Sequence, residues 1–126
     1  DTLIRFSQGA QQPLFVTDWK SNRLDEDGMA YVIDGYSRES MVHAMEHHHY
    51  PLQALIYGTA VYRYIRSRAA TSQSLPPIAG MAYFFIRGMV GEPTPIDNGN
   101  RHGVFTWEAP AGLWQELSDA ISGAGK

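Results

Sequence analysis

An aspartate and a lysine near the start of the chain have the types and spacing of a catalytic cation site. Asp18 and Lys20 stand two residues apart at the end of an apolar segment, residues 13–19, that has the pattern of a β-strand. Side chains two residues apart on a strand point to the same face of the sheet. This pair is a weak signal by itself, because both residue types are common at strand ends. Its meaning depends on what lies opposite Asp18.

The strand that ends at Asp18 has a predicted partner in residues 2–6. The two apolar segments flank the polar loop SQGAQQ, which is typical of a β-hairpin. With the centre of that loop as the turn, paired position numbers sum to 19, so that Ile4 faces Phe15 and Asp1 faces Asp18. Two opposed carboxylates repel each other unless a cation lies between them. The register therefore predicts a cation site.

Magnesium is the cation that suits this predicted site. It prefers oxygen ligands, is held by one or two carboxylates, and leaves positions for phosphate oxygens. The predicted ligands are the carboxylates of Asp1 and Asp18 and the backbone carbonyl of Trp19. Lys20, on the same face, would stabilise negative charge in the transition state of phosphate attack. This combination indicates a metal-dependent phosphodiesterase that holds one Mg²⁺ ion.

Gln53 and Tyr57 are four residues apart within a predicted helix and therefore lie on one face of it. An amide and a phenol placed in this way can contact the lysine, the metal shell or a nucleotide. The alternative is a polar pair at the edge of the core. Trp107 and Trp114 are predicted to be core residues.

The run of His47, His48 and His49, with His43 upstream, raises the possibility of a zinc site. Adjacent residues on a helix point about 100° apart, so only His43 and His47 share a face, and two ligands do not complete a zinc site. A polar helix end is the favoured interpretation, and contact with DNA phosphates is the second.

Two consecutive helices are expected to carry these residues. Residues 21–36 are acidic and contain glycine, which predicts a long loop over the end of the hairpin. Ser37 is the expected N-cap of a helix that ends near His48, and Pro51 is expected to start a second helix that runs to about Arg68. The second helix shows two neighbouring stripes of residues, one with Leu52, Leu55, Ile56 and Thr59, the other with Gln53, Tyr57, Ala60 and Tyr64.

The rest of the chain predicts two more strands and a helix. Residues 78–87 are apolar on both faces, as in a central strand covered on each side, and residues 104–107 form a short strand after a mobile connection over residues 88–103. Pro110 fits the first turn of a last helix, with Leu113, Leu117 and Ile121 along one side. The order β-β-α-α-β-β-α predicts an α/β fold with one mixed sheet flanked by helices.

Length and composition limit the alternatives. The 126 residues carry a net charge of −3 and no cysteine, which favours one domain over residues 1–126, excludes Cys-ligated zinc and suggests the cytoplasm. The longest apolar run, residues 78–86, is far shorter than the roughly 18 residues that cross a bilayer. The acidic balance argues against sequence-independent DNA coating. The abrupt start at Asp1 suggests a piece of a longer polypeptide, truncated at its N-terminus.

Several segments together resemble the C-terminal nuclease domain of RecB, the beta subunit of exodeoxyribonuclease V (the RecBCD helicase-nuclease), in the PD-(D/E)xK nuclease superfamily. The resemblance covers nearly the whole chain. Besides Asp1, it rests on the segments Val16-Thr17-Asp18-Trp19-Lys20-Ser21-Asn22, Tyr50-Pro51-Leu52-Gln53-Ala54-Leu55-Ile56-Tyr57, Tyr62-Arg63-Tyr64 and Tyr83-Phe84-Phe85-Ile86-Arg87-Gly88.

The resemblance implies a restriction-endonuclease-like core and Mg²⁺-dependent exonuclease hydrolysis of DNA during double-strand break repair by recombination. It implies that Asp1 and Asp18 bind the metal, that Lys20 is catalytic, and that Gln53 and Tyr57 help to position the site. The implied partners are DNA, the gamma and alpha subunits and the RecA recombinase. The family also uses a metal-binding histidine upstream of its first aspartate, and this chain begins after it, so the fragment alone is expected to bind Mg²⁺ poorly.

Two other functions are compatible with the residues. One is a nuclease-like scaffold or protein-docking module without chemistry. The argument against it is that the candidate site residues are intact, namely Asp1, Asp18, Lys20 and Gln53. The other is a free-standing restriction-type endonuclease.

Overall fold

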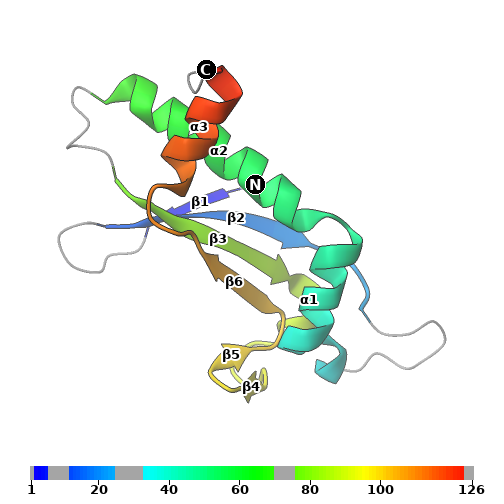
Figure 1. Cartoon of the computed structure of the whole chain (residues 1–126). Helices are drawn as coiled ribbons and strands as arrows, with labels where there is room; N and C mark the ends of the chain where they lie inside the picture. Colours follow the sequence, from blue (N-terminus) through cyan, green and yellow to red (C-terminus); the bar gives the residue numbers. More distant parts are fainter. Residues whose placement is uncertain (1, 6–11, 25–32, 70–75, 124–126) are drawn as a thin grey trace.

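The computed structural model describes residues 2–5, 12–24, 33–69 and 76–123. Its strands and helices, shown in Figure 1, are β1 (Thr2–Arg5), β2 (Leu14–Lys20), the 3-10 helix η1 (Ile33–Tyr36), α1 (Arg38–His47), α2 (Tyr50–Arg68), β3 (Ile78–Phe85), the 3-10 helix η3 (Ile86–Gly88), β4 (Ile96–Asp97), β5 (Asn100–Arg101), β6 (Val104–Glu108) and α3 (Leu113–Ser122). None of the helices in these ranges is long and apolar enough to cross a membrane.

A four-stranded mixed sheet organises the molecule, in the order β1-β2-β3-β6. The pairs β1–β2 and β3–β6 are antiparallel, whereas β2 and β3 are parallel and are connected through α1 and α2. The predicted α/β class and mixed sheet are confirmed. The predicted order is incomplete, because β4 and β5 form an additional small hairpin within residues 88–103.

The predicted hairpin register is confirmed over the described strands. Thr2 pairs with Thr17 and Ile4 with Phe15, so the paired position numbers sum to 19. The Thr17 hydroxyl donates a hydrogen bond of 2.8 Å to the Thr2 carbonyl and ties the two strands together. Asp1 lies outside the described residues, and its pairing with Asp18 stays a prediction.

The two consecutive helices begin where the sequence predicts. The Ser37 hydroxyl accepts a hydrogen bond from the Ser40 backbone amide and caps α1, which ends at His47. The backbone of His49 then takes a left-handed conformation, with φ of 56°, and turns the chain into α2, whose first turn holds Pro51. The boundaries of both helices are confirmed.

The predicted stripe of Leu52, Leu55, Ile56 and Thr59 on α2 is only partly buried. Leu52 and Ile56 are 60% and 55% exposed, while the small residues Ala54, Gly58 and Thr59 are buried. These small residues form the inner face because they let α2 approach its neighbours closely.

Three other boundaries differ from prediction. Part of the expected loop over residues 21–36 is the 3-10 helix η1. The central strand ends at Phe85, and a 3-10 turn follows. The last helix begins at Leu113 after Gly112, whose φ of 80° is left-handed, so Pro110 lies in the preceding turn and not in the helix.

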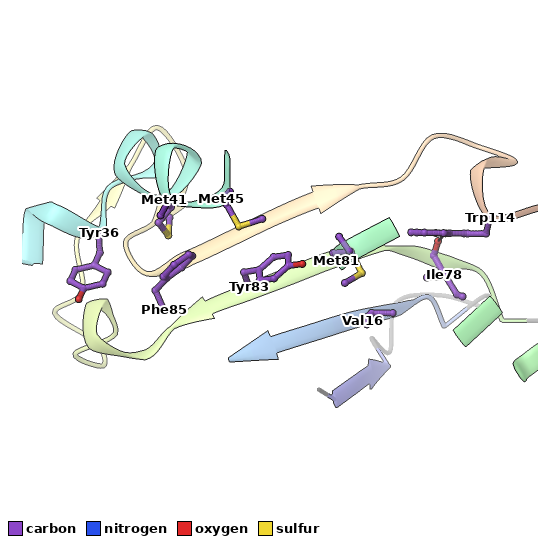
Figure 2. Close-up of a cluster of buried hydrophobic side chains, with 11 residues drawn as sticks. Val16, Tyr36, Met41, Met45, Ile78, Met81, Tyr83, Phe85 and Trp114 are labelled. Carbon is purple, nitrogen blue, oxygen red and sulfur yellow. Dashed lines mark hydrogen bonds between the residues drawn. The ribbon is translucent and has the colours of Figure 1, made fainter. Parts of the chain in front are cut away.

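The buried core lies on one face of the sheet, between the strands and the helices (Figure 2). Its members come from β2, β3 and all three helices, and they include Val16, Met41, Met45, Ala54, Met81, Tyr83, Phe85 and Trp114. The predicted burial of Trp114 is confirmed, and Trp107 packs against this core. Strand β3 is buried or half-buried on both faces, as predicted for a central strand, whereas on β2 Trp19 remains 50% exposed on the face opposite the core.

Candidate active site

Asp18 and Lys20 meet at the end of β2, as their spacing predicts. The Lys20 Nζ atom lies 2.5 Å from Asp18 Oδ2, and the two side chains are only 12% and 11% exposed. Both point to the face of the sheet that the helices cover, since Tyr83, the β3 partner of Asp18, belongs to the core there. The pair is therefore a nearly buried ion pair at the edge of the core.

Gln53 connects this pair to α2. Its Oε1 atom accepts a hydrogen bond of 3.1 Å from Lys20 Nζ, and its Nε2 atom donates one of 3.4 Å to the Tyr57 hydroxyl. The amide thus links the lysine to the phenol, which confirms that Gln53 and Tyr57 share a helix face. Gln53 contacts Lys20 directly, whereas Tyr57 is linked to Lys20 only through Gln53.

Asp18 Oδ2 is buried but makes no hydrogen bond within the described part of the chain. Its contact with Lys20 is close enough for an ion pair, but it lacks hydrogen-bond geometry, so the carboxylate is neutralised by charge alone. A buried carboxylate oxygen normally accepts one or more hydrogen bonds. This unused capacity fits a carboxylate that receives a further cation.

The remaining predicted metal ligands are only partly accounted for. Asp1 lies outside the described residues. Trp19 turns its side chain to the opposite face of the sheet, where its ring lies 4.7 Å from that of Phe84, so only its backbone carbonyl is a possible ligand. Among the residues that the structure describes, no three His, Asp or Glu side chains gather closely enough to hold a metal ion. Of the two carboxylates predicted for the site, only Asp18 lies among the residues that the structure describes.

Two aromatic rings lie beside Lys20 and a third residue holds one of them, and none of the three was assigned from sequence. Lys20 Nζ lies 4.0 Å above the ring centre of Tyr50 and 5.5 Å from that of Tyr83. The Asn22 side chain donates a hydrogen bond of 3.0 Å to the Tyr50 hydroxyl. Tyr50 could have been found from local sequence, because it precedes Gln53 by one helical turn. Tyr83 could not, because it lies beside Asp18 only through the parallel pairing of β2 with β3.

Burial raises the pKa of Tyr83 well above its ordinary value, and the negative charge of Asp18 and the neighbouring phenols of Tyr57 and Tyr50 raise it further. Tyr83 is therefore a neutral hydrogen-bond donor at physiological pH. Its hydroxyl donates to the Tyr50 carbonyl at 3.0 Å.

The histidines form a row beside this site. The rings of His43 and His47 stack with centres 6.5 Å apart, as their spacing predicts, and His48 meets His47 edge-on at 5.2 Å. His48 also stacks on Tyr50 at 5.3 Å. These histidines therefore form a polar end of α1 that lies next to Tyr50, the ring beside Lys20.

Comparison with known proteins identifies the relatives of this chain. No protein-family model matches it. It is 40% identical over 106 residues to the RecBCD enzyme subunit RecB of Mycolicibacterium smegmatis, 38% over 110 residues to that of Mycobacterium tuberculosis and 32% over 109 residues to that of Escherichia coli.

These matches cover 84%, 87% and 86% of this chain but only 8–10% of each relative. The chain thus spans about a tenth of the length of the curated relatives that it matches. By sequence the chain belongs to the RecB family, as the counterpart of one segment of a RecB subunit.

Proposed function

We propose that this chain is the nuclease domain of a RecB-type subunit and hydrolyses DNA phosphodiester bonds with Mg²⁺ during recombinational repair of double-strand breaks. Its proposed partners are DNA and the other subunits of a RecBCD-type complex, with the RecA recombinase acting on the product. Membership of the RecB family supports the setting. The chemistry is argued from the residues of the site.

The observation that carries the proposal is the cluster of Asp18, Lys20 and Gln53 at the end of β2. It holds a nearly buried carboxylate with unused acceptor capacity beside an ammonium group. A nearly buried ion pair is a costly feature for stability alone, since apolar residues of similar size often serve a core as well. A chemical role accounts for its presence.

Each residue has a proposed task. Asp18, together with Asp1 and the Trp19 carbonyl, would hold the Mg²⁺ ion, which when bound supplies Lewis-acid polarisation of a phosphodiester oxygen. The Lys20 ammonium would stabilise the negative charge that develops on the phosphate during attack, and in this nearly buried site that attraction is stronger than in water. Gln53 orients Lys20 through its 3.1 Å hydrogen bond.

The test is Lys20→Ala in the full-length subunit assembled with its partner subunits. We expect DNA cleavage to fall by about a hundredfold or more, the usual effect of losing one group that stabilises transition-state charge. ATP-dependent unwinding should be unchanged, because the motor lies in another part of such a complex.

The control is Arg101→Ala, which removes an exposed cation from β5. Normal cleavage by both variants would remove Lys20 from the chemistry and favour a nuclease-like scaffold instead. The melting temperature of each variant must be measured alongside, because Lys20→Ala leaves Asp18 without its ion-pair partner.

A further inference from the structure

The surroundings of Lys20 contain an aromatic contact that the proposed chemistry does not by itself require. The Lys20 Nζ atom lies 4.0 Å from the centre of the Tyr50 ring, well inside the range of about 6 Å for a cation–π interaction. The lysine side chain is only 12% exposed, so water competes weakly for its charge. Tyr50 therefore attracts the ammonium group through its ring face.

The Tyr50 ring is itself fixed from several directions. The Asn22 amide donates to its hydroxyl at 3.0 Å, and that hydroxyl lies 3.3 Å from Asn22 Oδ1. The ring stacks with those of His48 and Tyr83, at 5.3 Å and 5.8 Å between centres. Such a ring presents one fixed surface to the ammonium group.

The backbone of Tyr50 is held as well. The Tyr83 hydroxyl donates a hydrogen bond to its carbonyl at 3.0 Å. Tyr50 is the first residue of α2, directly after the left-handed turn at His49. Strand β3 and the start of α2 thus fix the ring relative to the end of β2.

We propose that Tyr50 is a positioning residue, whose ring holds the Lys20 ammonium group at the place where it meets the substrate phosphate. This inference rests on the proposed function for its catalytic consequence, but not for the contact itself. A lysine side chain has four rotatable bonds, and fixing them is costly in entropy. When a cation engages Asp18, the attraction of Asp18 for Lys20 weakens, and the Tyr50 ring and the Gln53 amide remain as its anchors.

The experiment compares Tyr50→Phe, which keeps the ring, with Tyr50→Met, which removes it. Both are made in the full-length subunit within its complex. For Tyr50→Met we expect kcat for DNA cleavage to fall about tenfold, as the strength of a partly desolvated cation–π contact implies, with little change in KM. Tyr50→Phe should stay within about threefold of wild type.

A second measurement reads the contact without using activity. In the same full-length proteins, amine acetylation followed by peptide mass spectrometry reports Lys20, with Lys126, the other lysine of this chain, as the internal reference. We expect Lys20 to be acetylated about tenfold faster in Tyr50→Met than in wild type or Tyr50→Phe. Tyr64→Met is the matched control, because Tyr64 is 59% exposed on the same helix.

The outcomes separate the two proposals. If Lys20→Ala keeps full cleavage, the proposed function fails, while the acetylation rates still test the contact. If acetylation of Lys20 is unchanged in a folded Tyr50→Met protein, or if Tyr50→Phe behaves like Tyr50→Met, the ring does not hold Lys20 and the inference is overturned. Tyr50→Leu supplies a second ring-free variant should Tyr50→Met not fold.

Discussion

Tyr83 joins the candidate site to the core, since its ring is buried while its hydroxyl reaches the Tyr50 carbonyl. Its ionisation is suppressed first by burial and then by the charge of Asp18. The ordinary pKa of a tyrosine in an unfolded chain is about 10. When folding raises the pKa of a group, its contribution to the stability of the native state is complete at pH values below the pKa of the unfolded chain. That contribution is lost as the pH rises above that pKa.

Tyr83→Phe tests this linkage. At neutral pH the variant should be less stable by about 1 kcal/mol, because the partly buried Tyr50 carbonyl loses the hydrogen bond from Tyr83. Above pH 10 the wild-type protein should lose up to about 1.4 kcal/mol per pH unit through Tyr83, a loss that phenylalanine lacks. The difference in unfolding free energy between the two proteins should therefore shrink above pH 10 and reverse by pH 12, so that Tyr83→Phe becomes the more stable protein, as measured by urea denaturation in metal-free buffer.

Tyr62→Phe is the comparison for the Tyr83 experiment, since Tyr62 is another hydrogen-bonded tyrosine but is only partly buried. The difference in unfolding free energy between Tyr62→Phe and the wild-type protein should stay constant from pH 10 to 12. A constant difference for Tyr83→Phe as well would show that Tyr83 ionises in the folded protein as it does in the unfolded chain.

Among the elements, the contact of α2 with α3 depends on the absence of one side chain. A Cβ atom on Gly58 would overlap the six-membered ring of Trp114. That ring is held, since the Trp114 indole donates to the Ile78 carbonyl at 2.9 Å. The close approach of the two helices therefore requires glycine at position 58.

Gly58→Ala should destabilise the protein although alanine is the better helix former. Helix propensity favours alanine by about 1 kcal/mol, but overpacking against a fixed ring costs about 1–3 kcal/mol. We expect a net loss of about 1 kcal/mol and a melting temperature lower by a few degrees. In a Trp114→Leu background the same substitution should be neutral or stabilising, and an equal loss in both backgrounds would exclude the ring as its cause.

Elements and contacts set by local sequence could be predicted, and those set by distant partners could not. The hairpin register followed from the length of one loop, and the start of α1 followed from the Ser37 cap. The buried face of α2 did not follow from hydropathy, because Gly58 and Ala54 are selected by what packs on them. Tyr83 was missed at the site for the same reason, as its place depends on a strand far away in sequence.

At the scale of the whole molecule, the described part of the chain supplies few ligands for a metal ion. Asp18 is the described carboxylate of the site, and no described group of three His, Asp or Glu side chains can hold an ion. Mg²⁺ binds tightly only when enough oxygen ligands complete its near-octahedral coordination shell. A RecB-type subunit is far longer than this 126-residue chain and can contribute further ligands from outside it.

We expect the isolated chain to bind Mg²⁺ only in about the millimolar range or weaker, and to cleave DNA slowly. Calorimetric titration of Mg²⁺ and Mn²⁺ into this chain and into a form extended upstream measures the difference. Asp18→Asn in the extended form is the control and should abolish the added affinity. Equal affinity and equal cleavage by the short and extended forms would show that the residues around Asp18 suffice.

The parallel pairing of β2 with β3 also decides when the site can exist during synthesis. Lys20, Gln53 and Tyr83 lie on β2, α2 and β3, so the ribosome must release both helices and the third strand before these side chains can meet. Parallel pairing across such a connection forms late, because the long loop must close first. We therefore expect the candidate site to be absent from a nascent or partly unfolded chain, so that under the proposed function DNA cleavage would begin only after this part of the chain has folded.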